Sequence, residues 1–213
     1  GGRYGDCLQK IKESNLHNQH DIICVTMAFD TAPWYADHPA DPSIRHASYV
    51  TDLVVPLIEK HYSTIEGKTG RLLLGFSKSG WGSFSLMLRN PDFFGYACSW
   101  DAPLLMDEDD FGIWTTEKQF GTARNMMRYS PVRWARKNGE KVQDSKRLVL
   151  LGHKFFGNRW ACPKNSPHTR TYHQHLQKLD IPHVYDNTVE APHNWNLQWL
   201  RPAVNKLMKQ ADN

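Results

Sequence analysis

Short runs of apolar residues recur along this sequence without regular polar alternation, and they restrict the fold more than any other feature. The runs occupy residues 21–29, 71–76, 96–100, 147–152 and 183–189. A half-exposed strand alternates apolar and polar residues, whereas a strand covered on both faces is apolar throughout. These runs are therefore expected to be buried strands.

Segments with helical patterns separate these runs. They are expected over residues 44–62, 78–88, 116–128, 131–137, 171–179 and 196–210. Ser43 is expected to cap the first helix, and Pro56 to kink it because proline removes a backbone donor. Strands that alternate with helices predict an α/β protein with a mostly parallel sheet covered by helices on both faces. Residues 103–146 have no strand signal and are expected to form a helical insertion after the third strand.

The size and charge of the chain exclude several classes of protein. Its 213 residues suit one domain, and 40% of them are hydrophobic. No apolar run approaches the ~18 residues that cross a bilayer. The formal net charge of +4 comes from intermixed basic and acidic residues, so neither a nucleic-acid partner nor a membrane is predicted.

One region is more basic than the rest. Beside two acidic residues, Glu140 and Asp144, it has eight basic ones: Arg124, Arg128, Arg133, Arg136, Lys137, Lys141, Lys146 and Arg147. A basic face exposed to solvent is the simpler interpretation, and a site for an anionic ligand is the alternative.

The cysteines and histidines do not indicate a metal site or a disulfide framework. The four cysteines show no metal-type spacing, and two of them lie inside apolar runs, where a free cysteine packs as a small hydrophobe. His173 and His175 are two residues apart, so on a helix their side chains diverge too far to bind one ion. We therefore expect neither a metal nor another cofactor.

The sequence LLLGFSKSGWG, residues 72–82, places a serine where a strand is expected to turn into a helix. Such a turn strains its central residue and needs small neighbours, and Gly75 and Ser79 meet that need. The hydroxyl of Ser77 would then stand clear of the sheet, with the backbone N–H of Lys78 directed at an oxyanion. An ordinary tight turn is the alternative, because glycine–serine strings are common in turns.

A serine hydroxyl needs a base to take its proton, and the sequence offers one beyond the last strand. In VEAPHNWNLQWL, His193 lies just past that strand and just before a helix. None of the other histidines has this position. A histidine in a surface loop is the alternative. Together, Ser77 and His193 indicate a nucleophile and its general base.

These segments resemble the putative esterase branch of the α/β-hydrolases, which includes relatives of esterase D and the feruloyl and acetylxylan esterases. The resemblance covers residues 21–200 and rests on PWYADHP, SYVTDLVVPLIEKHY, GFSKSGWGS and PHNWNLQWL. It implies one α/β-hydrolase domain over residues 1–213, with Ser77 as nucleophile and His193 as general base.

The opening GGRYGD resembles the end of the loop that supplies a second oxyanion donor in this family. The resemblance places that donor near Gly2 and Arg3. The N-terminal strands of the domain are then expected to lie outside this sequence, so the missing signal peptide leaves the compartment open.

The family usually carries its triad acid after the strand at residues 147–152, and that position is empty here. No Asp or Glu occurs in residues 153–179. Some α/β-hydrolases place the acid one strand earlier, where this sequence has Asp101, so Asp101 is the first candidate, ahead of Asp186 and Glu190. A helix cap or turn residue is an equally good interpretation of Asp101.

Aromatic residues near the expected carboxyl edge of the sheet are candidates for a substrate pocket. They are Trp34, Tyr35, Trp81 and Trp100, and packing in the core or at its rim explains each of them equally well. Residues 103–146 lie where this fold normally has a lid, and their basic excess is compatible with an anionic substrate such as an acidic glycan ester.

The sequence thus predicts a serine carboxylic ester hydrolase that forms an acyl-enzyme on a small or carbohydrate-linked ester. One alternative is a non-catalytic ligand-binding protein of the same fold, which the empty acid position favours. Another is an acyltransferase that uses the same serine. Neither the ester nor the oligomeric state is specified by these patterns.

Overall fold

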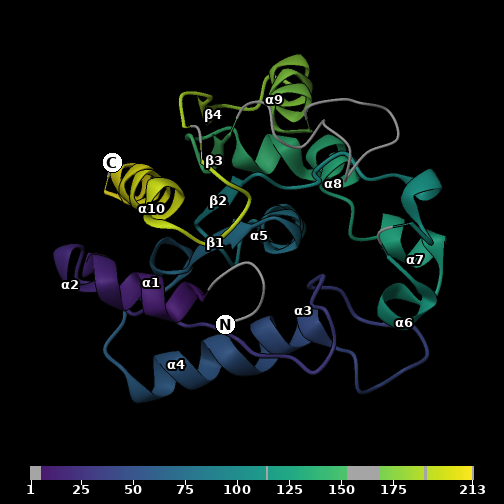
Figure 1. Cartoon of the computed structure of the whole chain (residues 1–213), viewed down its shortest axis with the longest axis horizontal. Coiled ribbons are helices and arrows are strands. Elements are labelled where there is room, and N and C mark those ends of the chain that lie inside the picture. The colour runs from purple at the N-terminus through teal and green to yellow at the C-terminus, as the bar shows by residue number, and fades with distance from the viewer. Residues whose placement is uncertain (1–5, 114, 153–167, 190, 213) are drawn as a thin grey trace.

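The computed structural model describes residues 6–113, 115–152, 168–189 and 191–212. Its centre is a parallel four-stranded sheet in the order β1-β2-β3-β4 (Figure 1). The strands are β1 (Leu72–Phe76), β2 (Tyr96–Trp100), β3 (Leu148–Leu151) and β4 (His183–Asp186). Strand order therefore follows chain order, and the carboxyl ends of all four strands lie at one edge. The predicted class, an α/β fold with a parallel sheet, is confirmed.

Helices cover both faces of this sheet, as the apolar runs predicted. Along β3, Leu148 and Leu150 pack into one core, while Val149 and Leu151 pack into the other. Successive strand residues point to opposite faces, so an unbroken apolar run is required when both faces are covered. In Figure 1, α5 and α8 lie on one side of the sheet and α10 and α1 on the other.

Most predicted helices are present with bounds close to those expected. The first core contains α5 (Lys78–Arg89), α8 (Pro131–Asn138) and α9 (His168–Lys178). The second contains α1 (Cys7–Ser14), which α2 (Leu16–Gln19) extends, and α10 (Leu197–Ala211). Among the described helices, none is both long and apolar enough to cross a membrane.

The strand predicted at residues 21–29 is wrong. These residues have no helix or strand, and β1 is the edge of the described sheet. Two of their apolar side chains, Ile23 and Val25, are 48% and 44% exposed. An apolar run becomes a strand only when another strand satisfies its backbone donors and acceptors, and no described strand lies beside this one.

The helix predicted at residues 44–62 forms, but with a different cap and an irregular centre. It consists of α3 (His46–Ser48), the π-helical η1 (Tyr49–Val54) and α4 (Val55–His61). Ser43 does not cap it; instead the Asp37 carboxylate accepts hydrogen bonds from the backbone N–H groups of Ala47 and Ser48, at 2.9 and 3.1 Å. The π-helical turn precedes Pro56, where a residue without an N–H interrupts the normal bonding pattern.

The helical insertion follows β2, not a third strand, because residues 21–29 do not join the sheet. It contains η3 (Glu108–Asp110), α6 (Glu117–Phe120), α7 (Ala123–Met127), α8 and η4 (Gly139–Val142). The helix predicted over residues 116–128 is split at Gly121, whose φ of 71° is outside the helical range. A further short turn, η2 (Lys68–Gly70), precedes β1.

Arg147 departs from the solvent-exposed basic face expected for this region. It is 2% exposed, and its guanidinium donates to the backbone carbonyls of Gly95, Phe94 and Lys141 at 2.7–2.9 Å. These carbonyls belong to the connections that precede β2 and β3. Arg147 therefore holds the chain entries to the sheet together, and its charge is not available to a ligand.

Acid is expected to destabilise the protein through His168, the first residue of α9. Burial lowers the pKa of His168 from 6.5 to about 4. Its Nδ1 accepts a hydrogen bond from the Leu105 N–H at 3.0 Å, so the folded state requires the neutral ring. Between these pKa values only the unfolded chain binds the proton, so stability is lost as the pH falls from 6.5 towards 4, by up to about 3 kcal/mol.

Urea denaturation at several pH values measures this loss. The difference between wild type and His168→Gln isolates the contribution of the ring, because the other titrating groups are common to both proteins. The same slope in both proteins over this pH range would contradict the prediction.

Candidate active site

Ser77 occupies a sharp turn between β1 and α5. Its φ and ψ are 55° and −125°, an unusual conformation for a residue with a side chain. Its backbone N–H donates to Trp100 O at 3.1 Å, which ties the turn to the end of the adjacent strand β2. The Ser77 carbonyl accepts the hydrogen bond from Trp81 N that begins α5. The turn thus places the hydroxyl at the carboxyl edge of the sheet.

The neighbours of Ser77 show why the turn needs small residues. A Cβ at Gly75 would lie 2.0 Å from the Ser79 carbonyl oxygen, and a Cβ at Gly80 would lie 2.6 Å from Ser99 Oγ. The Ser79 hydroxyl accepts a hydrogen bond from Phe76 N at 3.0 Å and donates to Phe76 O at 2.7 Å. Ser79 is therefore small, as expected, but it also clamps the turn through two bonds that sequence reasoning did not foresee.

Replacement Gly75→Ala is expected to lower the free energy of unfolding by about 3 kcal/mol, because backbone atoms block the added methyl group. Chemical denaturation measures the loss. Gly112→Ala is the comparison variant. Nothing lies within 4 Å of its added atom, so its loss measures only the strain of its φ of 89°, which Gly75 does not share. A loss at Gly75 no larger than that at Gly112 would contradict the predicted clash.

His193 lies beyond β4, in the segment that leads into α10. Its Nε2 is 3.2 Å from Ser77 Oγ, within hydrogen-bond distance. The imidazole packs against Phe76 with a centroid distance of 4.5 Å, and Trp195 contacts Phe76 edge-on at 5.6 Å. The predicted pair thus meets, and Phe76, which was not among the predicted site residues, packs against the imidazole.

Asp101 follows directly after β2, next to the end of β1. Its Oδ2 is 2.6 Å from His193 Nδ1, and its side chain is 3% exposed. Its φ of 46° and the bond from its N–H to Leu151 O, at 3.4 Å, fix it at the sheet edge. The contact fixes the imidazole by the nitrogen that faces away from Ser77.

The other two candidate acids are not at this contact. Asp186 accepts hydrogen bonds from Thr188 and lies 3.0 Å from Lys206 Nζ, on the α10 side of β4. These donors and Lys206 lower the pKa of Asp186 against the opposing effect of its partial burial. Glu190 lies outside the described residues.

Of the three predicted oxyanion donors, only Lys78 lies among the described residues. Lys78 is the first residue of α5, and the first N–H groups of a helix have no acceptor within the helix. Its N–H therefore belongs to the positive end of the helix dipole, beside the Ser77 hydroxyl. The other predicted donors, Gly2 and Arg3, lie outside the described residues.

The four aromatic candidates for a substrate pocket pack mainly within the protein. Trp81 and Trp100 are 0% exposed and Trp34 is 7% exposed, so these rings offer little or no surface to a ligand. Trp34 and Trp81 pack edge-to-face at 5.6 Å, and Trp100 packs edge-to-face against Trp195 at 5.0 Å. Tyr35 is partly buried, and burial raises its pKa to about 12, so its hydroxyl is neutral near pH 7.

No three metal-ligating side chains converge in the part of the chain that the structure describes. His173 instead bonds to His183, with 2.7 Å between Nδ1 and Nε2, and stacks on Tyr185 at 4.1 Å. Burial lowers the pKa of both histidines. This pair belongs to the packing of α9 on β4.

The arrangement has the parts of a nucleophilic site. A hydroxyl at a strained turn contacts an imidazole, whose other nitrogen contacts a buried carboxylate, and a helix N-terminus lies beside the hydroxyl. Such a chain of groups can move a proton from serine to histidine while an acyl group is transferred to the serine oxygen.

Comparisons with known proteins address the family and the fold of the chain. The family model described as "Putative esterase" matches residues 25–199. A search of curated proteins finds no sequence match. Solved structures, in contrast, match over nearly the whole chain.

Three of these structures illustrate the similarity. The fluorophosphonate-binding serine hydrolase FphF of Staphylococcus aureus has a TM-score of 0.68 and 14% identity, covering 97% of this chain and 77% of that one. MPT51 (FbpC1) of Mycobacterium tuberculosis has a TM-score of 0.70 and 13% identity, and the match covers 99% of this chain and 85% of that one. An S-formylglutathione hydrolase of Agrobacterium tumefaciens has a TM-score of 0.63 and 15% identity, and the match covers 98% of this chain and 79% of that one. At these identities the likeness shows a shared fold.

Proposed function

Because the chain belongs to the putative esterase family, we propose that it hydrolyses carboxylic esters through an acyl-enzyme on Ser77, with His193 as general base and Asp101 as triad acid. One observation carries the proposal: a buried carboxylate, an imidazole and a serine hydroxyl form a continuous chain of contacts of 2.6 and 3.2 Å. If Asp101 and His193 had only a structural role, as an ion pair or turn residues, a serine hydroxyl beside the imidazole would not be needed.

Acylation begins when Ser77 Oγ attacks the ester carbonyl carbon. The hydroxyl proton passes to His193 Nε2 as the new C–O bond forms, and the carbonyl oxygen becomes an oxyanion. Collapse of this intermediate breaks the bond to the alcohol oxygen, which takes the proton from His193 as it leaves. Asp101 stays ionised throughout and stabilises the imidazolium through Nδ1.

Deacylation repeats these steps with water as the nucleophile. Water loses a proton to His193 Nε2 and adds to the acyl carbon, and the second intermediate expels Ser77 Oγ, which recovers that proton. The carboxylic acid is released and the three side chains return to their initial states. The cycle is balanced without a cofactor.

The backbone N–H of Lys78 is proposed as one oxyanion donor, and Gly2 or Arg3 as the second. Preorganised N–H groups stabilise the charge that develops on the carbonyl oxygen, and the start of α5 adds its dipole to the first donor. Gly2 and Arg3 are taken from family resemblance alone.

The substrate is proposed to be a small or carbohydrate-linked ester. The proposal takes residues 1–213 as one α/β-hydrolase domain in which residues 103–146 shape the substrate pocket. Of the aromatic candidates, Tyr35 is kept for this pocket, since Trp81 and Trp100 have no exposed surface and Trp34 is only 7% exposed.

A fluorophosphonate probe tests the proposal directly, because it forms a covalent adduct only with an activated serine. The wild-type protein should be labelled, and peptide mass spectrometry should map the adduct to Ser77. A folded protein that stays unlabelled would favour a ligand-binding protein. Labelling and an acyl-enzyme without ester hydrolysis, together with faster acyl transfer to an added alcohol, would favour an acyltransferase.

A further inference from the structure

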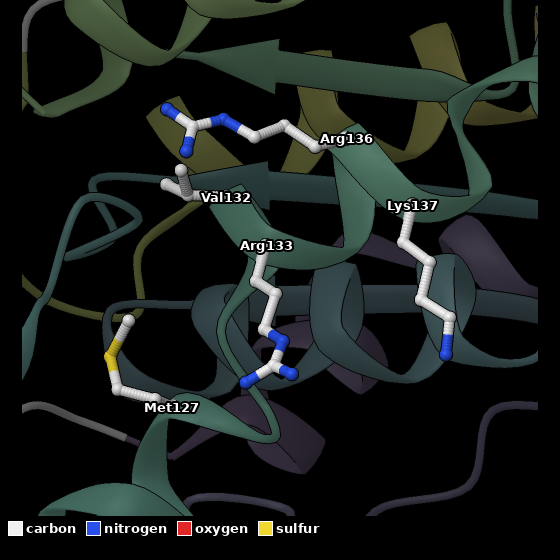
Figure 2. Close-up of a pocket in the computed structure, with 5 residues that line it drawn as sticks. All are labelled: Met127, Val132, Arg133, Arg136 and Lys137. Carbon is white, nitrogen blue, oxygen red and sulfur yellow. The ribbon is translucent and has the colours of Figure 1, made fainter.

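A second concave site lies on the helical insertion, on the surface of α8. It is a cavity of about 390 Å³ lined by two apolar residues, Met127 and Val132, and by Arg133, Arg136 and Lys137. Figure 2 shows Arg133 and Lys137 projecting to the same side of α8, while the Arg136 guanidinium extends beside Val132. Ser77, His193 and Asp101 do not line it.

In the described part of the chain, the three cations of this cavity have no partner of opposite charge. Arg133, Arg136 and Lys137 form no ion pair among the described residues, and the chain has no acidic residue from 122 to 139. They stand three and four positions apart on α8, where like charges repel and destabilise a helix. A bound anion would remove this repulsion, so the charge pattern favours an anionic occupant.

The cavity also has an apolar side. Met127 and Val132 are half-buried and pack against the core on this face of the sheet. A fully hydrated inorganic ion would gain nothing from these side chains. A ligand with an apolar body and an acidic group would cover them and reach the cations at the same time.

An adjoining cavity extends the positive surface. It measures about 200 Å³, shares Val132 and Arg136 with the first, and is also lined by His175 and Lys178 of α9. Burial and the positive charges of Arg136 and Lys178 lower the pKa of His175. Cations from two helices thus surround the groove formed by both cavities.

We propose that this α8 groove binds a small amphipathic anion: one carboxylate, sulfate or phosphate group on an apolar body. The volume of the larger cavity lies within the range of about 300–1,000 Å³ typical of small-molecule sites. A long polyanion would use the cations but not the apolar side chains. The groove is a site separate from Ser77, and the proposal does not depend on ester hydrolysis.

Isothermal titration calorimetry with octanoate tests the proposal, with octan-1-ol as the uncharged probe. Octanoate should bind, and the triple variant Arg133→Gln/Arg136→Gln/Lys137→Gln should raise its Kd at least tenfold. The matched variant Lys12→Gln/Arg124→Gln/Lys146→Gln loses the same net charge at exposed positions outside the groove. It should change the Kd less than twofold.

The position of the bound octanoate is tested by the methyl resonance of Met127 in protein labelled at its methionine methyl groups, assigned with Met127→Leu. This resonance should shift during the octanoate titration of wild type and should not shift in the groove variant. Such a readout separates the groove from the Ser77 site, where a carboxylic acid could also bind as a product.

Several results would overturn the proposal. They are no octanoate binding up to 10 mM, equal binding of octanol, equal loss in both triple variants, or binding that leaves Met127 unshifted. Tight binding of polygalacturonate that both triple variants weaken equally, without octanoate binding, would show a diffuse basic face instead of a ligand site.

Discussion

Replacement Ser77→Ala is expected to reduce kcat for 4-nitrophenyl acetate by about 10⁶-fold, to near the background rate. Alanine removes the oxygen that forms the acyl-enzyme, so no nucleophile remains at the Ser77 position beside His193 Nε2. Initial rates at saturating substrate, with labelling by a fluorophosphonate, measure the loss. Labelling should disappear together with turnover.

The control for this variant is Ser85→Ala in α5, the helix that follows Ser77. The Ser85 hydroxyl is buried and has no hydrogen-bond partner among the described residues, so its removal should leave activity within about twofold of wild type and the fold intact. Retention of more than a hundredth of the activity in Ser77→Ala would place the nucleophile elsewhere. The circular dichroism spectrum and the melting temperature of Ser77→Ala should match those of wild type, because the Ser77 side chain does not cap α5.

Replacement Asp101→Asn is expected to reduce kcat by about 10⁴-fold with little change in KM. The carboxylate at 2.6 Å accepts a hydrogen bond from Nδ1–H, which keeps the ring proton on Nδ1 and leaves Nε2 free to take the proton of Ser77. An asparagine amide can instead donate to Nδ1, which leaves the proton on Nε2, where it blocks the base. Steady-state kinetics on a soluble ester measures the effect.

Asp186→Asn is the matched control, because Asp186 follows the same pattern of a carboxylate at the end of a strand but pairs with Lys206. It should retain activity within a few fold of wild type. A large loss in Asp186→Asn together with near-normal turnover in Asp101→Asn would transfer the acid role to Asp186 and contradict the geometry proposed for the triad.

The elements that flank the Ser77 turn could be predicted from local sequence. The strand before it and the helix after it were predicted within a few residues, because continuous apolar residues and the small residues Gly75 and Ser79 leave few other conformations. The same reasoning predicted β2 at its observed bounds and β3 and β4 within three residues of theirs. It also placed His193 after the last strand.

Contacts between distant segments were less predictable. The cap of α3 comes from Asp37 and not from Ser43, and Arg147 is buried under backbone carbonyls, although residues 143–146 just before it are exposed. Residues 21–29 have the composition of a strand, but no strand of the described sheet lies beside them. In each case the outcome depends on what lies nearby in space, and the local pattern does not contain that information.

The sequence by itself determined a parallel α/β sheet with a serine at a strained strand-to-helix turn, because side-chain period and turn chemistry act over a few neighbouring residues. Only the tertiary structure decided which carboxylate meets the imidazole and that Met127 and the cations of α8 line one cavity. Asp101 and His193 are 92 residues apart, and His193 and Ser77 are 116 apart. Such contacts are fixed by the alignment of parallel strand ends at one sheet edge, which appears only when the whole chain packs.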